Sequence, residues 1–407
     1  MNTGILFSLF LVGNSLAGSA QDKSPIQLFT KREKGIEVVQ RDSLFSLRFQ
    51  FRAQIRAGYF STSETDFTPD EFEFRVRRLR MALRGFVISP KITYYIQLSF
   101  SRGDMDWSSA SSTIYNTSPN IIRDAMAYYA PVPWLKFGLG QTKLPGNRQR
   151  VVSSGNLQFA DRSIVNSNFT LDRDCGFFVT LESNRIRWKS AVTSGEGRNS
   201  IQSDKGLNYT SRLEFLPFGK FTGDNEDQEG DLVREPEPKL SFGATYNYNA
   251  RAVRQAGTLG SDLYEPVNMQ NLHLDLSFKF KGIALLSEYC NRIVNKDVTV
   301  DPSDSTSIRA VYHGFGSNTQ LSYNFKNNFE IAFRYAFIVP DKNLYNNSTY
   351  SWLAYGRQNQ YILGLSKYIY GHRLKLQGNF LYDQRVSMTS GGNSGNFGAI
   401  FQIEIGI

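Results

Sequence analysis

The sequence predicts an all-β fold: a transmembrane antiparallel β-barrel of about 16 strands with short periplasmic turns and long extracellular loops. Apolar and polar residues alternate strictly along many segments, which is the pattern of a sheet with two different faces. Tyrosine and phenylalanine are frequent, at 21 and 31 of 407 residues, although the mean hydropathy is negative. A membrane barrel combines these properties because only alternate residues of each strand meet lipid.

The alternation is clearest over residues 44–59, which read LFSLRFQFRAQIRAGY. One face of this segment is an almost unbroken apolar and aromatic row, and the other carries Arg48, Arg52 and Arg56. Strands of soluble sheets rarely exceed about ten residues, whereas a tilted strand of roughly 9–11 residues crosses a membrane. The arginines are spaced roughly 13 Å apart along a strand that rises about 3.3 Å per residue. We interpret the segment as a wall between lipid and a water-filled, anion-attracting pore.

The N-terminus has the pattern of an export signal. An apolar run over residues 5–16 is followed by small residues at 17–20, although no Lys or Arg precedes the run. We therefore expect residues 1–20 to be a signal peptide and residues 21–43 a periplasmic segment, with a short extra strand at 35–40. No other window approaches the roughly 18 apolar residues that a membrane helix needs.

The second long strand, residues 72–87, contains FEFRVRRLRMALRGF. Its apolar phase changes at Arg77-Arg78, which predicts a β-bulge, and bulges re-aim side chains. Beyond the change of phase, Arg78, Arg80 and Arg84 share the face opposite the leucines.

The same alternation continues to the end of the chain, and the connections alternate between short turns and long polar loops. This is the plan of an outer-membrane barrel occupying residues 44–407. Further strands are expected at residues 91–101, 121–130, 133–143, 175–183, 185–194, 206–216, 239–250, 270–281, 283–293, 310–325, 328–339, 358–370, 372–384 and 396–407.

Two connections stand out. Residues 217–239 lie on the short-turn side but are long and rich in Asp, Glu and Pro, and we expect a mobile acidic insertion. The longest loop, about residues 144–174, carries several arginines. Since sixteen strands leave an aqueous lumen, this loop is expected to fold inward and narrow it.

Several stretches together resemble one family, the phosphate-selective porins O and P. They read, in order, FSLRFQFRAQIRAGYF, FRVRRLRMALRGF, IIRDAMAYYAPVPWLKFGLGQTKLP, FADRSIVNSNFTLDRDCGF, TSRLEFLPFG and GHRLKLQGNFLYD. The resemblance implies a trimeric, sixteen-stranded outer-membrane porin with an inward third long loop and an arginine-lined path for phosphate-like anions. By motif, Arg77-Arg78 matches the family's arginine pair, and Asp124 matches an acidic residue near its constriction. The chain departs from the family in ending at Ile407 instead of an aromatic residue.

The basic composition points to an anionic partner, since the formal net charge is +9. Nucleic acid is not expected, because aromatic and basic residues lie on opposite faces here and do not share one. Arginine suits a phosphate path because its planar fork donates bidentate hydrogen bonds and stays charged. The candidate pore-lining residues are Arg48, Arg52, Arg56, Arg77, Arg78, Arg80, Arg84 and Asp124.

The alternative reading of these arginines is structural. They could pair with inward carboxylates such as Glu182, Glu214, Asp275 and Glu288 and only stiffen the wall. Four further cations in and beside the long loop are expected to be solvated surface. They are Lys143, Arg148, Arg150 and Arg162.

Enzyme chemistry has little support in the sequence. The three histidines lack metal-ligand spacing, and neither a P-loop nor a nucleophile elbow is present, although a Ser-His-acid set formed in space stays open. We expect no catalysis and no cofactor. Cys175 and Cys290 fall on non-neighbouring predicted strands and are expected to be unpaired.

The sequence therefore predicts a passive outer-membrane channel of a Gram-negative bacterium that favours anions, with phosphate or polyphosphate the leading solutes. The expected partners are inorganic phosphate or other small anions, membrane lipid, lipopolysaccharide and two further copies of the chain in a homotrimer. Two other classes stay open: a non-conducting barrel that acts as an adhesin or binds a partner through its long loops, and an exported β-sandwich lectin.

Overall fold

The structure, a computed structural model, describes residues 26–31, 35–40, 44–63, 66–101, 121–200, 206–345, 356–387 and 392–407. The sequence-predicted signal peptide at 1–20 lies outside these residues. Sixteen of the described strands form one closed antiparallel barrel. These strands are β3 (Ser46–Ser61), β4 (Glu71–Val87), β5 (Ser89–Ser99), β6 (Ile122–Val132), β7 (Leu135–Lys143), β8 (Arg173–Glu182), β9 (Ile186–Thr193), β10 (Asn208–Phe215), β11 (Lys239–Arg254), β12 (Asp262–Phe280), β13 (Ile283–Val294), β16 (Gly314–Asn324), β17 (Phe329–Pro340), β18 (Arg357–Tyr370), β19 (Leu374–Val386) and β20 (Asn393–Gly406).

Each strand pairs with its neighbour in the chain, and the barrel closes where β20 pairs with β3. The predicted fold class is confirmed, and each of the sixteen expected strands has its counterpart within a few residues, except that β11 and β12 extend further into the connection between them. The hairpin of β14 (Val298–Asp301) and β15 (Asp304–Ala310) in the loop after β13 was not predicted from the sequence.

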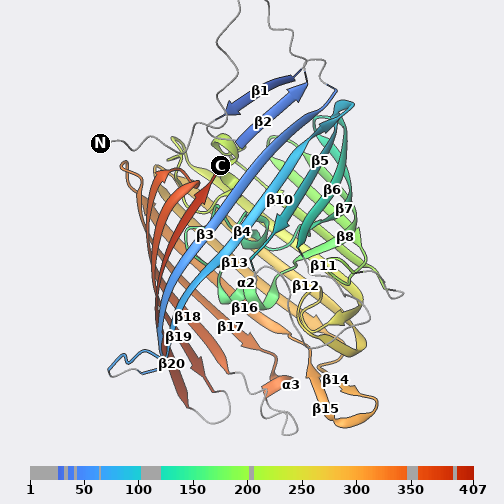
Figure 1. Cartoon of the computed structure of the whole chain (residues 1–407). Coiled ribbons are helices and arrows are strands. Elements are labelled where there is room, and N and C mark those ends of the chain that lie inside the picture. Colours follow the sequence, from blue (N-terminus) through green and yellow to red (C-terminus); the bar gives the residue numbers. More distant parts are fainter. Residues whose placement is uncertain are drawn as a thin grey trace, which may run out of the picture.

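The two ends of the barrel differ (Figure 1). Short turns lie at the end that carries the C-terminus, and the long loops, with the β14–β15 hairpin and helix α3 (Lys342–Tyr345), lie at the other. One short turn is formed by Lys281 and Gly282, which both have positive φ, at 49° and 96°. Two consecutive positive φ values are those of the type I′ turn, whose twist matches a tight hairpin. By the convention of such barrels, the short-turn end faces the periplasm.

A small hairpin extends the sheet at the short-turn end. Strand β2 (Gly35–Gln40) is the short extra strand that the sequence predicts, and it pairs with residues 46–49 of β3. Strand β1 (Ile26–Lys31), which was not predicted, pairs with β2. The C-terminal residue Ile407 pairs through its backbone with Phe51, immediately beyond this contact. The hairpin therefore covers the edge of β3 that the end of β20 leaves open.

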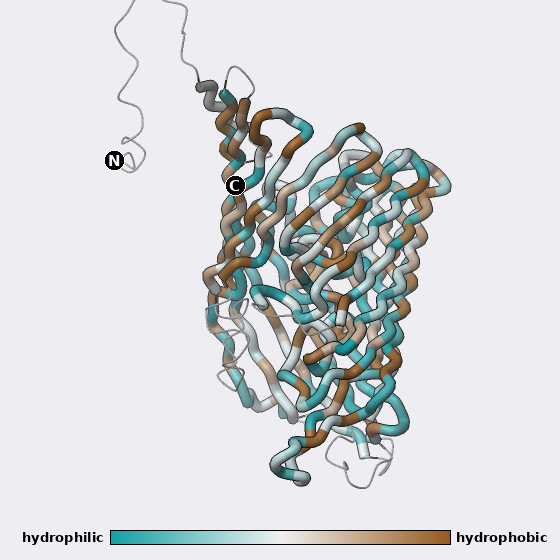
Figure 2. The backbone as a smooth tube through the Cα atoms, turned by 90° about the vertical axis from the view of Figure 1, so that its right-hand side faces the viewer, coloured by the Kyte–Doolittle hydropathy of each residue, from teal (hydrophilic) through white to brown (hydrophobic). Residues whose placement is uncertain are grey.

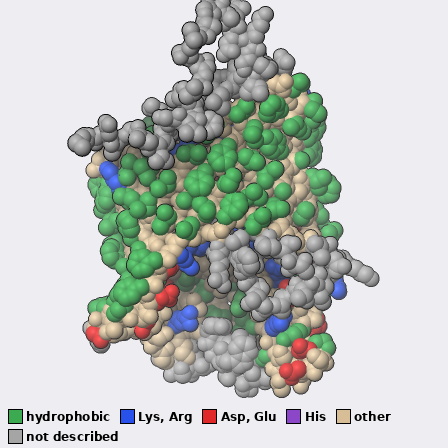
Figure 3. All heavy atoms as spheres, in the orientation of Figure 1, with side chains coloured by type: hydrophobic (Ala, Val, Ile, Leu, Met, Phe, Trp, Pro, Cys, Tyr) green, Lys and Arg blue, Asp and Glu red, His purple; other side chains and the backbone are tan. Residues whose placement is uncertain are grey.

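The strand residues alternate between a lipid-facing and a lumen-facing set. In β10, Tyr209, Leu213 and Phe215 are exposed, whereas the intervening Arg212 and Glu214 are buried. On the face seen in Figure 3, apolar side chains form a broad band across the barrel, and charged side chains gather below it at the long-loop end. Hydrophobic and hydrophilic positions are interleaved along the strands (Figure 2). Among the helices of the described residues, none has the length and apolar character to cross a membrane.

The predicted bulge is present in β4. Gln54 pairs with Arg78 and the next residue, Ile55, pairs with Val76, so Arg77 is the extra residue. Arg77 and Arg78 are adjacent in the sequence, yet both side chains reach the lumen, where they contact the same carboxylate. The bulge thus allows two consecutive arginines of β4 to face the lumen.

The insertion after β10 is packed inside the barrel, which overturns the expectation of a mobile segment. It forms a short 3₁₀ helix, η2 (Thr222–Asp227), and its Glu229, Asp231 and Glu235 are at most 1% exposed. Asp231 accepts a hydrogen bond from the backbone N–H of Gly282 at 2.7 Å. The sequence pattern was misread because acidic residues with Pro are typical of mobile segments, whereas here basic lumen residues neutralise the acids.

Deleting Arg77 should leave the barrel able to assemble, because this extra residue has no partner on β3. Without it, Val76 and Arg78 become consecutive and keep their partners on β3, so the apolar residues of segment 71–76 still face lipid. Deleting Ala82 instead, which does have a partner on β3, shifts one flank of β4 by one residue and turns its apolar side chains toward the lumen and its charged ones toward lipid. A charge on the lipid face costs up to about 2–4 kcal/mol near the membrane centre. Heat-modifiable gel mobility of refolded protein in detergent should show folding of the Arg77 deletion but not of the Ala82 deletion; failure of the Arg77 deletion would show that assembly requires the bulge.

Candidate functional site

The loop between β7 and β8 lies inside the barrel and contains helices α1 (Arg148–Val151) and α2 (Ile164–Phe169). The Ser163 hydroxyl caps α2 by accepting the N–H of Asn166 at 3.2 Å. Helix α2 packs Val165 and Phe169 against small and apolar residues that β13 and β17 turn inward. The loop is therefore held against the lumen wall by an apolar contact in a mostly polar interior.

A second anchor of this loop is Phe159. Its ring packs with Ala332 and Ile362, and the guanidinium of Arg334 lies 4.1 Å from the ring centroid. A Cβ on Gly364 would come within 2.8 Å of the ring. Gly364 therefore gives Phe159 the space to approach the strand backbone.

The insertion meets this loop inside the lumen. The Glu229 carboxylate accepts the N–H of Gln158 and the side-chain amide of Gln149, each at 3.0 Å. On the far side of the lumen, Gln228 contacts His372 in the turn between β18 and β19 at 3.1 Å. We call the loop and insertion together the plug (residues 144–172 and 217–238).

Charges within the plugged sector are matched. Arg212 on β10 is fully buried and donates to both oxygens of Asp275, at 2.7 and 3.0 Å. The loop's Arg148 donates to the same carboxylate at 2.8 Å. Arg187 on β9 pairs with Glu226 of the insertion at 2.8 Å. This side of the lumen is thus filled and close to neutral.

The open sector lies along β3, β4 and β5, where three neighbouring cavities remain. Their volumes are about 530 Å³ toward the long loops, about 370 Å³ in the middle and about 590 Å³ toward the short turns. Arg80 lines all three, so it marks their junction. Among the residues that line them, sixteen Arg or Lys side chains accompany seven side-chain carboxylates. Unlike the plugged sector, this sector carries a net positive charge.

In the outer cavity, Asp161 of the loop contacts three wall arginines. Its oxygens lie 2.6 Å from Arg56, 3.2 Å from Arg77 and 3.4 Å from Arg78. Burial raises the pKa of the Asp161 carboxyl, but the guanidiniums of these arginines outweigh burial and hold the pKa well below its usual range. We call Arg56, Arg77 and Arg78 the arginine nest.

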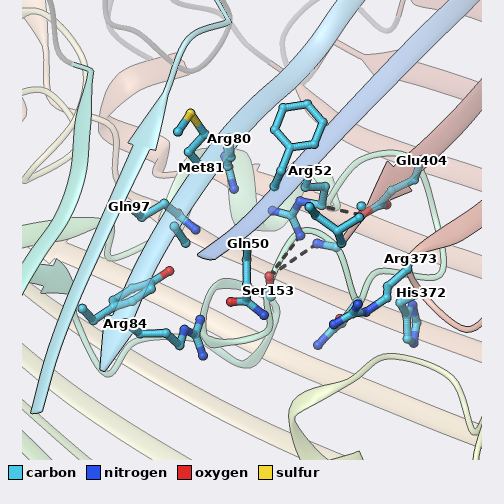
Figure 4. Close-up of a pocket in the computed structure, with 17 residues that line it drawn as sticks. Gln50, Arg52, Arg80, Met81, Arg84, Gln97, Ser153, His372, Arg373 and Glu404 are labelled. Carbon is cyan, nitrogen blue, oxygen red and sulfur yellow. Dashed lines mark hydrogen bonds and ion pairs between the residues drawn. The ribbon is translucent and has the colours of Figure 1, made fainter. Parts of the chain in front are cut away.

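The middle cavity is framed by arginines that contact loop hydroxyls. Arg80 and Arg52 donate to the Ser154 hydroxyl at 2.8 and 2.9 Å. Arg52 also donates to Ser153 at 3.3 Å, and its Nε lies 3.7 Å from Glu404. The side chains of Arg52, Arg84 and Arg373 surround Ser153 in this cavity (Figure 4).

The inner cavity brings cations and tyrosines together. Within the described part of the chain, Arg84 forms no ion pair, and its guanidinium lies 4.7 Å from the centroid of the Tyr95 ring. Arg48 pairs with Glu37 of β2 at 2.9 Å. Asp124 pairs with Arg173 through two hydrogen bonds of 3.0 Å.

All eight sequence-predicted site residues line these cavities, with the seven arginines along the open wall and Asp124 in the inner cavity. The structural alternative is wrong in its stated pairings. Glu214 and Asp275 pair with Arg148, Arg187 and Arg212. Most of the candidate arginines do pair with carboxylates, but with different ones, namely Glu37, Glu73, Asp161 and Glu404. The functional role of the eight residues stays a prediction.

The expectation of solvated surface for the cations of the long loop is wrong. Arg148 is fully buried in the plug, Arg150 and Arg162 line the outer cavity, and Lys143 lines the inner one. Sequence reasoning also missed five cavity-lining groups. Alternation within β6 and β8 could have flagged Arg123 and Arg173. No such local pattern points to Asp161 in the loop, to Arg198 after β9 or to Arg373 in the turn between β18 and β19.

Neither a metal site nor a disulfide is found in the described ranges. No group of three or more His, Cys, Asp or Glu side chains there could hold a metal ion. Cys175 and Cys290 are both free, as the strand order predicts.

Replacing residues 220–236 with a short Gly-Ser linker should raise the single-channel conductance at least about twofold. Removing the insertion leaves the plugged sector partly empty, and a barrel of this strand number is wide enough for water to fill it. The measurement is the step size in planar bilayers. Shortening the β14–β15 hairpin, which lies beyond the barrel wall, is the control and should leave the step unchanged. An unchanged step in the linker variant would mean that the loop alone blocks this sector.

Comparison with known proteins agrees with this architecture. Residues 49–251 match the family model described as phosphate-selective porin O and P. A search of curated proteins gives no match.

Among solved structures, the chain is similar to OmpT (trimer form), an outer membrane protein of Vibrio cholerae, with 9% identity and a TM-score of 0.52 over 88% of this chain and 99% of that one. It is also similar to the outer membrane channel DcaP of Acinetobacter baumannii, with 12% identity and a TM-score of 0.51 over 89% and 97%. Identities this low support the fold alone. The resemblance predicted from the sequence motifs is confirmed: over residues 49–251 the chain matches the phosphate-selective porins O and P, and its barrel is that of an outer-membrane porin channel.

Proposed function

We propose that this porin passes small anions along the open sector of its lumen, with inorganic phosphate the leading solute and polyphosphate an extended form of the same chemistry. The observation that carries the proposal is the charge of this sector, where cationic side chains outnumber carboxylates by sixteen to seven. Focused positive potential in a narrow, low-dielectric passage attracts anions and repels cations. The channel catalyses no reaction and needs no cofactor in this proposal.

The arginines form a stepped path for such an anion. It meets the arginine nest in the outer cavity, then Arg80 at the junction, and then Arg84 and Arg48 in the inner cavity. Each guanidinium offers bidentate hydrogen bonds that match phosphate oxygens. Conduction also needs each site to release its ion. Arg80 and Arg52 already donate to serine hydroxyls, which are neutral acceptors that an anion displaces at modest cost.

The cellular setting follows from the same proposal. Residues 1–20 direct export, residues 21–43 lie in the periplasm, and residues 44–407 span the outer membrane of a Gram-negative bacterium, in contact with lipid and lipopolysaccharide. The solved OmpT structure carries the words "trimer form" in its description. We extend that assembly to this chain as a homotrimer.

The direct test is conductance of purified protein in planar bilayers. Discrete steps with a reversal potential that favours chloride over potassium are expected in a salt gradient. A barrel without steps would support the alternative of an adhesin that uses its long loops. Steps with cation preference would overturn the anion path and leave the fold intact.

Arg80→Gln should raise the phosphate concentration that half-blocks chloride current roughly tenfold or more, because a charge-assisted hydrogen bond contributes about 1.5–3 kcal/mol. The matched control is Arg185→Gln, since Arg185 is exposed in a short turn and lines none of the three cavities. Equal block in the two variants would remove Arg80 from the path.

A further inference from the structure

The outer cavity contains an anion that belongs to the protein itself. Asp161 projects from the loop into the arginine nest, with one oxygen on Arg56 and the other shared between Arg77 and Arg78. Two carboxylate oxygens thus occupy guanidinium donors that would otherwise face a solute. The Asp161 side chain is still 36% exposed, so the contact is open to the cavity and reachable by a permeating ion.

The backbone around Asp161 is fixed, so the carboxylate cannot drift away from the nest. Its carbonyl accepts a hydrogen bond from Arg334 at 2.9 Å. The preceding residue, Ala160, donates its N–H to Asn379 at 2.8 Å. Phe159 adds the apolar anchor described above. These contacts reach strands β17, β18 and β19, which adjoin the strands of the nest across β20, so the carboxylate is held in place from a separate part of the wall.

The carboxylate is charged under all ordinary conditions, because its pKa lies well below the usual range. Three guanidiniums face Asp161 and, 3.7 Å from Arg56, Glu73, which leaves an excess of one positive charge. Added negative charge is therefore still attracted to the nest, but less strongly than it would be without Asp161.

We propose that Asp161 is a tethered counter-anion that competes with the permeating anion for the arginine nest and thereby speeds its release. This inference rests on the proposed anion path. It adds a residue, Asp161, that lowers the affinity of the arginine nest for the permeating anion. A doubly charged tetrahedral oxyanion such as hydrogen phosphate is the solute class that the nest admits best. Such an ion brings more charge and more acceptor oxygens than the carboxylate that it must displace, whereas chloride brings one charge and no directional acceptor pair.

The experiment compares Asp161→Asn with wild type by phosphate block of chloride current in planar bilayers. The amide keeps an acceptor oxygen but removes the negative charge. Half-block should occur at a roughly tenfold lower phosphate concentration, and individual block events should last longer. Two like charges about 6 Å apart interact by the equivalent of a tenfold affinity change at an effective dielectric constant of about 40.

The matched control is Asp383→Asn. Asp383 lines the same cavity and accepts a hydrogen bond from Gln360 at 2.9 Å, but no ion pair with an arginine is found for it among the described residues. Its substitution changes the net charge by the same amount and should shift the block far less. Asp161→Glu, which restores a carboxylate, should return the block toward the wild-type value.

A purely structural role gives the opposite result. If Asp161 only holds the loop against the wall, Asp161→Asn loosens the loop, makes the current noisy, lowers the melting temperature and weakens phosphate block. Unchanged or weaker block would overturn the inference while wild type stays anion selective. Absence of anion preference in wild type itself would instead remove the proposed function on which the inference rests.

Discussion

Ion pairing between the plug and the basic side chains of the lumen wall is the interaction on which the shape of the pore depends. Arg187 of β9 pairs with Glu226, and Lys279 of β12 donates to the backbone carbonyl of Asn225 at 2.6 Å. Burying charges costs several kcal/mol for each ion unless every charge has a well-placed partner. In this sector the partners are present, so two irregular segments with many polar groups can fill part of an interior that water would otherwise occupy.

The division of charge follows from this packing. A sixteen-stranded barrel with inward-facing arginines all around would be a wide, uniformly positive tube. Here the carboxylates of the plug and of β10 and β12 neutralise one side, and the arginines of β3 and β4 keep most of their charge on the other. The same loop that completes the neutral side also presents Ser153, Ser154 and Asp161 to the arginines of the open side. One segment therefore determines both where solvent is excluded and what an anion meets.

The strands could be predicted from the sequence because a two-residue period is a local signal, and the bulge at Arg77 was predicted from a local change of that period. The interior could not be predicted in the same way. The Asp161 carboxylate contacts Arg56 and Arg78, which precede it by 105 and 83 residues. The acidic insertion looks like a mobile segment until its partners on β9 and β12 are known. Alternation indicates that an arginine faces the lumen, but only the fold indicates which carboxylate it meets there.

The contact between the first and last strands of the barrel, β3 and β20, constrains how the chain assembles. Gln54 of β3 donates a hydrogen bond to Glu404 of β20, 350 residues away, and the β1–β2 hairpin covers the remaining edge of β3. A contact of such sequence separation carries a larger loop-closure entropy than a hairpin between neighbouring strands, so we expect it to form after those hairpins. Until it forms, β3 exposes an unpaired edge over the half that β20 will cover, while the hairpin already occupies the rest. The hairpin thus shortens the unpaired strand edge through which the unclosed sheet could pair with other chains before β3 and β20 meet.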